Sequence, residues 1–144
     1  MKVSRSALLP HSAMQMYEIV ADVEQYPKFL NWCEQAEVLA RDEDEIVARL
    51  KISYGKLKVG FTTRNQNVQG ESIQLNLVEG PFSNFQGNWY FQPLGESACK
   101  VSIEMKFDFD RSLTPTIFAK VFEKIMNMQL DAFQKRARQL HGGS

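Results

Sequence analysis

The chain has 144 residues, 44% hydrophobic and 24% charged, a balance typical of a globular domain. Its 17 lysines and arginines match its 17 aspartates and glutamates, so the general electrostatic signature of a nucleic-acid-binding protein is missing, and no DNA partner is expected. No stretch approaches the roughly 18 apolar residues of a membrane-spanning helix, and the first residues resemble neither a signal nor a transit peptide. We therefore expect a cytoplasmic protein, and its length predicts one domain over residues 1–144.

A strand over residues 3–9 is predicted first, followed by a helix that begins after Ser12. Gln15 follows Ser12 by three positions, the spacing of a capping box, in which each side chain bonds the other residue's backbone amide. The helix is expected to end before Pro27, because proline disfavours a helical backbone in the residue before it. Residues 28–32 are expected to form one further short turn.

Alternating apolar and polar residues predict a further six strands. Successive side chains of a strand point to opposite faces, so this period of two gives each strand one dry face and one wet face. The pattern is strictest near the end of the chain, and glycine, proline and acidic residues mark the turns. The expected strands cover residues 36–41, 45–53, 56–64, 73–77, 85–91 and 99–110.

A long helix is predicted to begin near Ser112 and Pro115 and to end at Gly142. Proline fits the first helical turn, because a backbone N–H there would be unpaired anyway. An apolar stripe with helical spacing runs from Phe118 to Leu140. Packing this stripe against the dry sheet face predicts an α+β fold, in which a curved antiparallel sheet of about seven strands grips the C-terminal helix, with two short helices after the first strand.

Several motifs resemble those of one protein family in the same order. They are Arg5-Ser6-Ala7-Leu8-Leu9-Pro10, Ser12-Ala13-x-x-Met16-Tyr17, Asp22-Val23-x-x-Tyr26-Pro27-x-Phe29-Leu30-x-Trp32-Cys33, Phe61-Thr62-Thr63-Arg64-Asn65, Leu77-Val78-Glu79-Gly80-Pro81-Phe82 and Gly87-x-Trp89-x-Phe91-x-Pro93-Leu94. This set resembles the bacterial ribosome association toxin RatA family, which includes the coenzyme Q-binding proteins and lies within the START-like, polyketide-cyclase-like superfamily. The resemblance covers nearly the whole chain and implies the helix-grip (START-like) fold.

The same resemblance implies a cavity between the sheet and the long helix, suited to ubiquinone or another prenyl lipid. The first functional hypothesis is therefore a non-enzymatic carrier of a hydrophobic ligand that supports respiration, with transient contact to a membrane surface. The alternative is a ribosome association toxin that binds the large (50S) ribosomal subunit and blocks subunit joining. A minor alternative is a polyketide cyclase or aromatase. No cofactor is expected other than such a bound lipid.

Catalytic residues are not evident in the sequence. His11 and His141 fall outside any metal-ligand spacing or nucleophile motif, and the acidic residues of the last strand lie on its wet face. A cyclase needs acid–base groups inside its cavity, within hydrogen-bond reach of the substrate. We therefore expect a binding protein and no enzyme, with neither catalytic residues nor a metal site.

Aromatic and methionine side chains are expected on the inward faces, where they would line a ligand cavity. For each of them a packed core is the alternative, because protein interiors are filled to crystal-like density. The candidate cavity residues are Phe29, Trp32, Phe61, Phe82, Phe85, Trp89, Met105, Phe107, Phe118, Phe122 and Met126. Arg5 has the same strand parity as Val3 and Leu9, which makes it a candidate polar contact for a ligand head group; a solvent-exposed position at the sheet edge is the alternative.

Cations gather on the wet face of one expected hairpin. If Tyr54-Gly55 is a two-residue turn, Lys51 faces Lys58 directly, and two lysines in that arrangement are destabilising without an anion nearby. Together with Arg49 they form what we call the hairpin patch (Arg49, Lys51 and Lys58). It is a candidate contact for RNA phosphate or anionic lipid, and a solubilising sheet face is the alternative.

Overall fold

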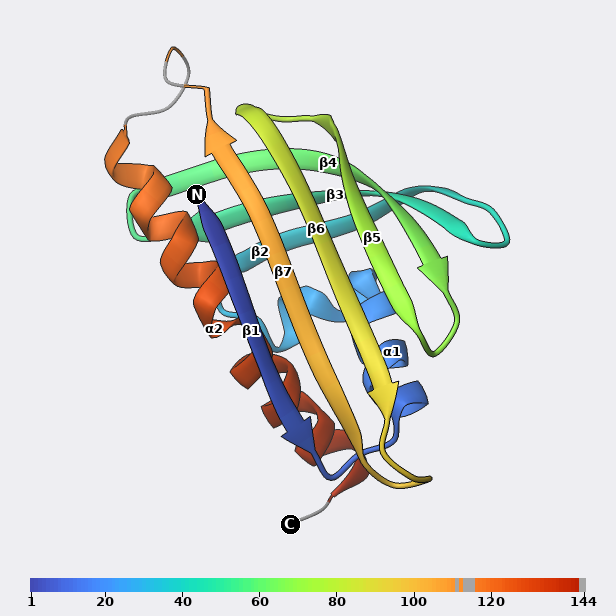
Figure 1. Cartoon of the computed structure of the whole chain (residues 1–144). Helices are drawn as coiled ribbons and strands as arrows, with labels where there is room; N and C mark the ends of the chain where they lie inside the picture. The colour runs from blue at the N-terminus through green and yellow to red at the C-terminus, as the bar shows by residue number, and fades with distance from the viewer. Residues whose placement is uncertain (111, 113–115, 143–144) are drawn as a thin grey trace.

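The computed structural model describes residues 1–110, 112 and 116–142. Figure 1 shows a strongly curved sheet, with the long C-terminal helix lying against it on the side where the first helix also lies. This is the predicted α+β helix-grip architecture. The elements in chain order are β1 (Lys2–Leu9), α1 (Ala13–Ala21), η1 (Val23–Lys28), β2 (Cys33–Arg41), β3 (Glu45–Tyr54), β4 (Leu57–Val68), β5 (Ser72–Glu79), β6 (Phe82–Pro93), β7 (Cys99–Phe109) and α2 (Thr116–His141).

The strands form one antiparallel sheet of seven strands in the order β1-β7-β6-β5-β4-β3-β2. From β2 to β7 each strand is bonded to its sequence neighbours, while β1 adds to β7, so the two ends of the chain's β-structure lie side by side. Strands β2 to β4 cross behind the others in Figure 1. This crossing is the accumulated twist of a long sheet, and it creates the hollow that α2 fills.

Local sequence signals account for several of these elements. In β7 the odd-numbered residues are buried and the even-numbered ones exposed or half-buried, as the alternation predicts. The capping box of α1 is present: the Ser12 N–H donates to Gln15 Oε1 at 3.0 Å, and the Gln15 N–H donates to Ser12 Oγ at 3.1 Å. The helix ends earlier than predicted, because a 3-10 helix that contains Pro27 follows from Val23.

The hairpin between β3 and β4 corrects the predicted register. Gly55 is the first of the two turn residues, where its φ of 59° suits a glycine, and not the second. Lys51 consequently lies opposite Gly60, and Lys58 lies opposite Ser53. The predicted direct Lys51–Lys58 pair is therefore wrong, although both side chains keep the predicted outer face.

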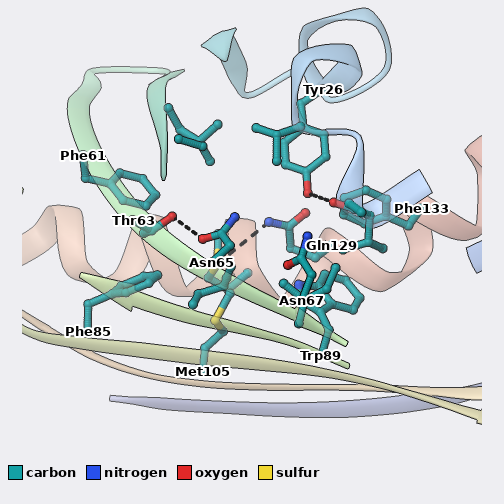
Figure 2. Close-up of a pocket in the computed structure, with 18 of the residues that line it drawn as sticks. Tyr26, Phe61, Thr63, Asn65, Asn67, Phe85, Trp89, Met105, Gln129 and Phe133 are labelled. Atoms are coloured by element: carbon teal, nitrogen blue, oxygen red, sulfur yellow. Dashed lines mark hydrogen bonds between the residues drawn. The ribbon is translucent and has the colours of Figure 1, made fainter. Parts of the chain in front are cut away.

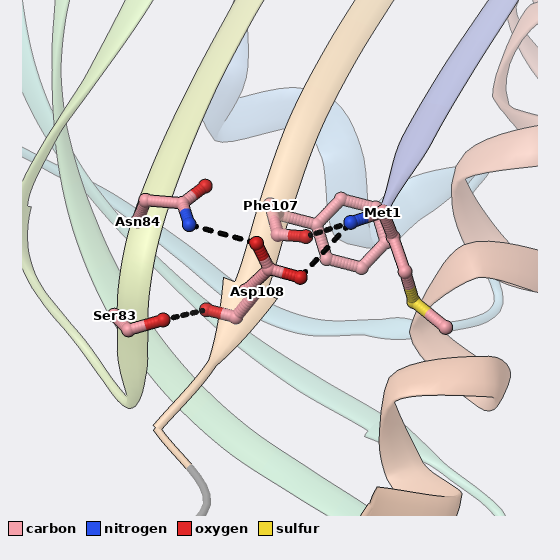
Figure 3. A network of polar contacts seen from close by, with 5 residues as sticks. All are labelled: Met1, Ser83, Asn84, Phe107 and Asp108. Atoms are coloured by element: carbon pink, nitrogen blue, oxygen red, sulfur yellow. Dashed lines mark hydrogen bonds and ion pairs between the residues drawn. The ribbon is translucent and has the colours of Figure 1, made fainter.

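The start of the chain is tied to the end of β7 (Figure 3). The amino group of Met1 donates to the Phe107 carbonyl oxygen at 2.8 Å and forms an ion pair with Asp108 Oδ1 at 2.9 Å. Asn84 Nδ2 donates to the other carboxylate oxygen of Asp108 at 2.8 Å, and Ser83 Oγ donates to the backbone carbonyl oxygen of Asp108 at 3.3 Å. Because these groups are exposed, the network contributes little stability and mainly fixes the position of β1.

Helix α2 buries one face along its whole length, including Phe122, Ile125 and Phe133. It ends as predicted: Gly142 has a φ of 68°, and its N–H donates to the Arg138 carbonyl oxygen at 2.9 Å, a left-handed helix cap. The predicted cap at residues 113–115 lies outside the described residues. Within the described ranges, no helix combines the length and the apolar character needed to cross a membrane.

Candidate functional site

A cavity of about 50 Å³ lies between the curved sheet and α2 (Figure 2). A buried water needs roughly 10–15 Å³ of such volume, so the cavity has room for a few waters. Its walls are mainly apolar. Of the residues predicted to line it, six do so: Trp32, Phe61, Phe85, Trp89, Met105 and Met126.

One side of the cavity is polar. Thr63, Asn65 and Asn67 reach it from β4, where they continue the inward parity of Phe61, and Gln129 faces them from α2 (Figure 2). Sequence reasoning placed Thr63 on the dry face of its strand without giving it a role, and it missed Asn65 and Asn67 because the expected strand stopped at residue 64. Extending the same alternation by three residues would have revealed them. Gln129 interrupts the apolar stripe of the helix, a signal of the same kind.

Hydrogen bonding in this polar group is incomplete. Thr63 Oγ1 donates to Asn65 Oδ1 at 2.7 Å, and both residues are buried. Gln129 Nε2 has only a weak contact with Met126 Sδ at 3.9 Å. Among the described residues, the side-chain oxygens of Gln129 and Asn67 have no hydrogen-bond partner. A buried acceptor left in this state costs about 1–3 kcal/mol, so the two oxygens are ready to accept hydrogen bonds from a guest in the cavity.

The cavity lacks strong acids and bases. Tyr26 is the single titratable side chain among the described lining residues; burial raises the pKa of its phenol, and its hydroxyl donates to the Val20 carbonyl oxygen. The site can therefore hold a neutral molecule by hydrogen bonds and apolar contact. The pair of acid–base groups that general acid–base catalysis requires is not found among these residues.

Three predicted cavity residues lie in solid packing. The Phe122 ring of α2 has its centroid 4.8 Å from that of Phe107 and 5.4 Å from that of Phe82, with Phe109 also at 5.4 Å. Rings from β6, β7 and α2 meet edge-on, an arrangement that fills space efficiently. Phe82, Phe107 and Phe122 therefore form core and do not border the cavity, and half-buried Phe118 is likewise outside its lining.

Two further candidates lie away from the cavity. Phe29 contacts Tyr26 and Phe133 from outside and borders a separate groove at the protein surface. Arg5 is exposed on the edge strand β1, although Val3 and Leu9 on either side are buried. The structure thus supports the solvent-exposed alternative for Arg5 and does not bring it to the cavity.

The hairpin patch is present on the outer sheet face. Arg49, Lys51 and Lys58 are exposed, and Lys51 and Lys58 are diagonal neighbours in the corrected register. Lys51 Nζ lies 4.0 Å from Glu34 Oε2, and no ion pair is found for Arg49 or Lys58 within the described part of the chain. The patch therefore leaves cationic charge available to an anionic partner.

Sequence comparison connects this architecture to known proteins. Residues 9–134 match the family described as polyketide cyclase / dehydrase and lipid transport. A Pseudomonas aeruginosa protein named ribosome association toxin RatA is 42% identical over 140 residues, which cover 97% of each chain. An Escherichia coli protein of the same name is 37% identical, with 97% of this chain and 89% of that protein covered. A Xenopus laevis protein named coenzyme Q-binding protein COQ10 homolog B, mitochondrial, is 26% identical over 96% of this chain and 59% of its own length.

Comparison with solved structures supports the same fold. The Zhui aromatase/cyclase from a Streptomyces species superposes with a TM-score of 0.83 at 19% identity, covering 100% of this chain and 99% of that chain. A Thermus thermophilus protein superposes with a TM-score of 0.84 at 18% identity, covering 98% of this chain and 99% of that chain. At these identities the likeness concerns the fold alone.

Proposed function

The chain belongs to the polyketide cyclase/dehydrase and lipid transport family, and we propose that within this family it acts on the ribosome. Specifically, the protein would bind the large ribosomal subunit in the bacterial cytoplasm and thereby hinder subunit joining. The observation that carries it is the 42% identity to a protein named ribosome association toxin RatA over 97% of both chains. Such a match leaves little of either chain outside the shared part.

The surface offers a physical basis for this function. Ribosomal RNA presents phosphates, and exposed cations bind them with release of counterions. The hairpin patch supplies such cations on a protein whose overall formal charge is zero. A local patch on a neutral protein favours a defined contact site over general attraction to nucleic acid.

Sucrose-gradient sedimentation of purified ribosomal subunits tests the proposal. Added protein is expected to migrate with the large subunit and to reduce the fraction of joined ribosomes. The variant Lys51→Glu/Lys58→Glu is expected to lose both effects. Lys100→Glu/Lys120→Glu carries the same charge change at exposed positions on β7 and α2 and serves as the matched control. If the wild-type protein stays at the top of the gradient at low salt, the proposed function is wrong.

A second candidate function is supported by the cavity. We propose that the space beneath α2 receives ubiquinone or a related prenyl lipid, whose ring oxygens and apolar tail would meet the amides and the aromatic wall. In the structure the cavity of about 50 Å³ holds only a few waters by volume, so this function requires α2 or Trp32 to move outward. Native mass spectrometry of gently purified protein is expected to detect a prenyl quinone. Protein that stays free of lipid after incubation with quinone-loaded vesicles would rule this candidate out.

A further inference from the structure

A surface groove between the segment after η1 and the last turns of α2 has no role in the functions above. It encloses about 430 Å³. Its lining includes Lys28, Lys135 and Arg136, with no carboxylate among the described residues that form it. Phe29 and Trp32 supply apolar surface at its base. The groove therefore combines three cations with an aromatic floor on a protein of zero formal net charge.

One cation of the groove lies over an aromatic ring. The guanidinium carbon of Arg136 lies 5.1 Å from the centroid of the Phe29 ring. That ring is itself fixed by edge contacts, 5.5 Å from Phe133 and 6.1 Å from Tyr26 between centroids. Stacking on an aromatic face leaves the opposite face of a planar guanidinium open to a further flat group. We call the Arg136 guanidinium over the fixed Phe29 ring the Arg136 platform.

The rim of the groove carries groups of two other kinds. Lys28 and Lys135 are exposed, so their ammonium groups can reach anions on either side of the platform. Asn31 and Gln139 are exposed neutral amides, which can both donate and accept hydrogen bonds. Flat stacking surface, amides and flanking cations match the plane, the edge and the phosphates of a nucleotide.

The groove is connected to the hairpin patch through the backbone. The Ser53 N–H donates to the Trp32 carbonyl oxygen at 2.9 Å, and Ser53 pairs with Lys58 across the hairpin. Trp32 at the base of the groove and Lys58 on the outer sheet face are therefore linked through one residue. Between them lies the start of the edge strand β2, where Glu34 approaches Lys51 at 4.0 Å. The groove and the hairpin patch therefore adjoin the same part of the fold.

We propose that this groove binds an unpaired nucleotide of ribosomal RNA, with the base stacked on the Arg136 platform. In this arrangement Lys28 and Lys135 contact the neighbouring phosphates, and Asn31 and Gln139 face the base edge. The inference rests on the proposed ribosome association and identifies a contact for it that sequence reasoning did not find. A lipid head group needs only point charges, so the guanidinium over the Phe29 ring and the amides favour RNA as the occupant.

The experiment uses the full chain with two probes: purified large ribosomal subunits and a short fluorescein-labelled single-stranded RNA. Lys28→Glu/Lys135→Glu is expected to weaken binding of both by about tenfold or more and to lower the salt dependence by about one phosphate contact per lysine. Arg136→Lys keeps the charge and removes the flat stacking surface, so it is expected to weaken binding of both probes by about tenfold. Lys100→Glu/Lys120→Glu, with the same charge change, is expected to bind within about twofold of wild type. Urea midpoints confirm that each variant is folded.

The outcomes separate the groove from the proposed function. If wild type and Lys51→Glu/Lys58→Glu differ in subunit binding but the groove variants bind like wild type, the groove inference is wrong and the ribosome proposal stands. If wild type binds no subunits yet binds the short RNA in a way that Arg136→Lys weakens, the ribosome proposal fails and the groove remains a nucleotide site. If the protein binds vesicles of anionic phospholipid and not the RNA, with loss in the same variants, the RNA assignment is overturned.

Discussion

Two spaces are both lined by Trp32, and they differ in volume and in the charge of their walls. The inner cavity has a volume of about 50 Å³ and is lined by neutral groups, with unpartnered amide oxygens from Gln129 and Asn67. The outer groove has a volume of about 430 Å³, and its described lining contains three cations and no anion. In this fold the larger and more strongly charged space therefore lies outside the hollow between sheet and helix.

The largest effect is expected from removing the Trp32 side chain, which separates the two spaces. Trp32 is 2% exposed, so Trp32→Ala is expected to lower the free energy of unfolding by about 3–5 kcal/mol and to join the two spaces. Urea unfolding measures the loss. Leu39→Ala changes a residue of β2 that is 50% exposed and is expected to stay within about 0.5 kcal/mol of wild type. Equal small losses for both variants would mean that Trp32 is not a packed wall.

The buried polar pair of the cavity provides the next test. Asn65→Leu leaves the Thr63 hydroxyl without its acceptor in a buried site, so we expect a loss of about 1–3 kcal/mol in unfolding free energy. Thr63→Val/Asn65→Leu removes both partners and should recover most of that loss. A double variant less stable than Asn65→Leu alone would contradict the pairing.

A smaller effect on stability is expected at Gln129, whose side-chain oxygen lacks a hydrogen-bond partner among the described residues. Gln129→Met keeps an unbranched side chain of similar size and removes the unpartnered oxygen, so unfolding free energy should be unchanged or raised by up to about 1 kcal/mol. Affinity for large ribosomal subunits should stay at the wild-type value, because the change is confined to the inner cavity. A loss of more than about 2 kcal/mol would show that the amide is satisfied by a bound guest.

Alkaline pH is also expected to lower stability. Burial raises the pKa of the Cys33 thiol from its ordinary value of 9.0 to about 11, so the folded protein holds this proton more tightly than the unfolded chain does. The resulting stability is complete below pH 9 and is lost as the pH rises toward 11. Cys33→Ala should therefore show a shallower decline of the urea midpoint between these pH values. Identical declines would mean that Cys33 does not titrate as a buried thiol. Tyr17, Tyr26 and Cys99, whose pKa values burial also raises, contribute to the decline in both proteins.

The fold was largely predictable because its main signals are local. Strict alternation in β7 and the Ser12–Gln15 capping box each depend on residues only a few positions apart, and both are present as predicted. The register of the β3–β4 hairpin was not predictable in this way, because it depends on whether Gly55 takes the first or the second turn position. Either position leaves each side chain on the same face of the sheet. A shift by two residues is invisible to an argument from parity.

The candidate site was predictable only in part, because it depends on how distant elements meet. Strand alternation correctly predicted that Phe61 points inward, and the apolar stripe of the helix did the same for Phe122. Neither pattern could show that Phe122 packs against Phe107 while Phe61 also borders the cavity. The groove escaped prediction for the same reason. Phe29 and Arg136 are more than a hundred positions apart in sequence, and no periodic pattern connects them.

We propose that cations on the outside of the fold, and not the inner cavity, bind the ribosome. The most direct test is the affinity of wild-type protein for purified large ribosomal subunits, measured across a series of salt concentrations. We expect the logarithm of the affinity to fall linearly with the logarithm of the salt concentration, with a slope that corresponds to several phosphate contacts. Binding that is absent at low salt, or present and insensitive to salt, would contradict it.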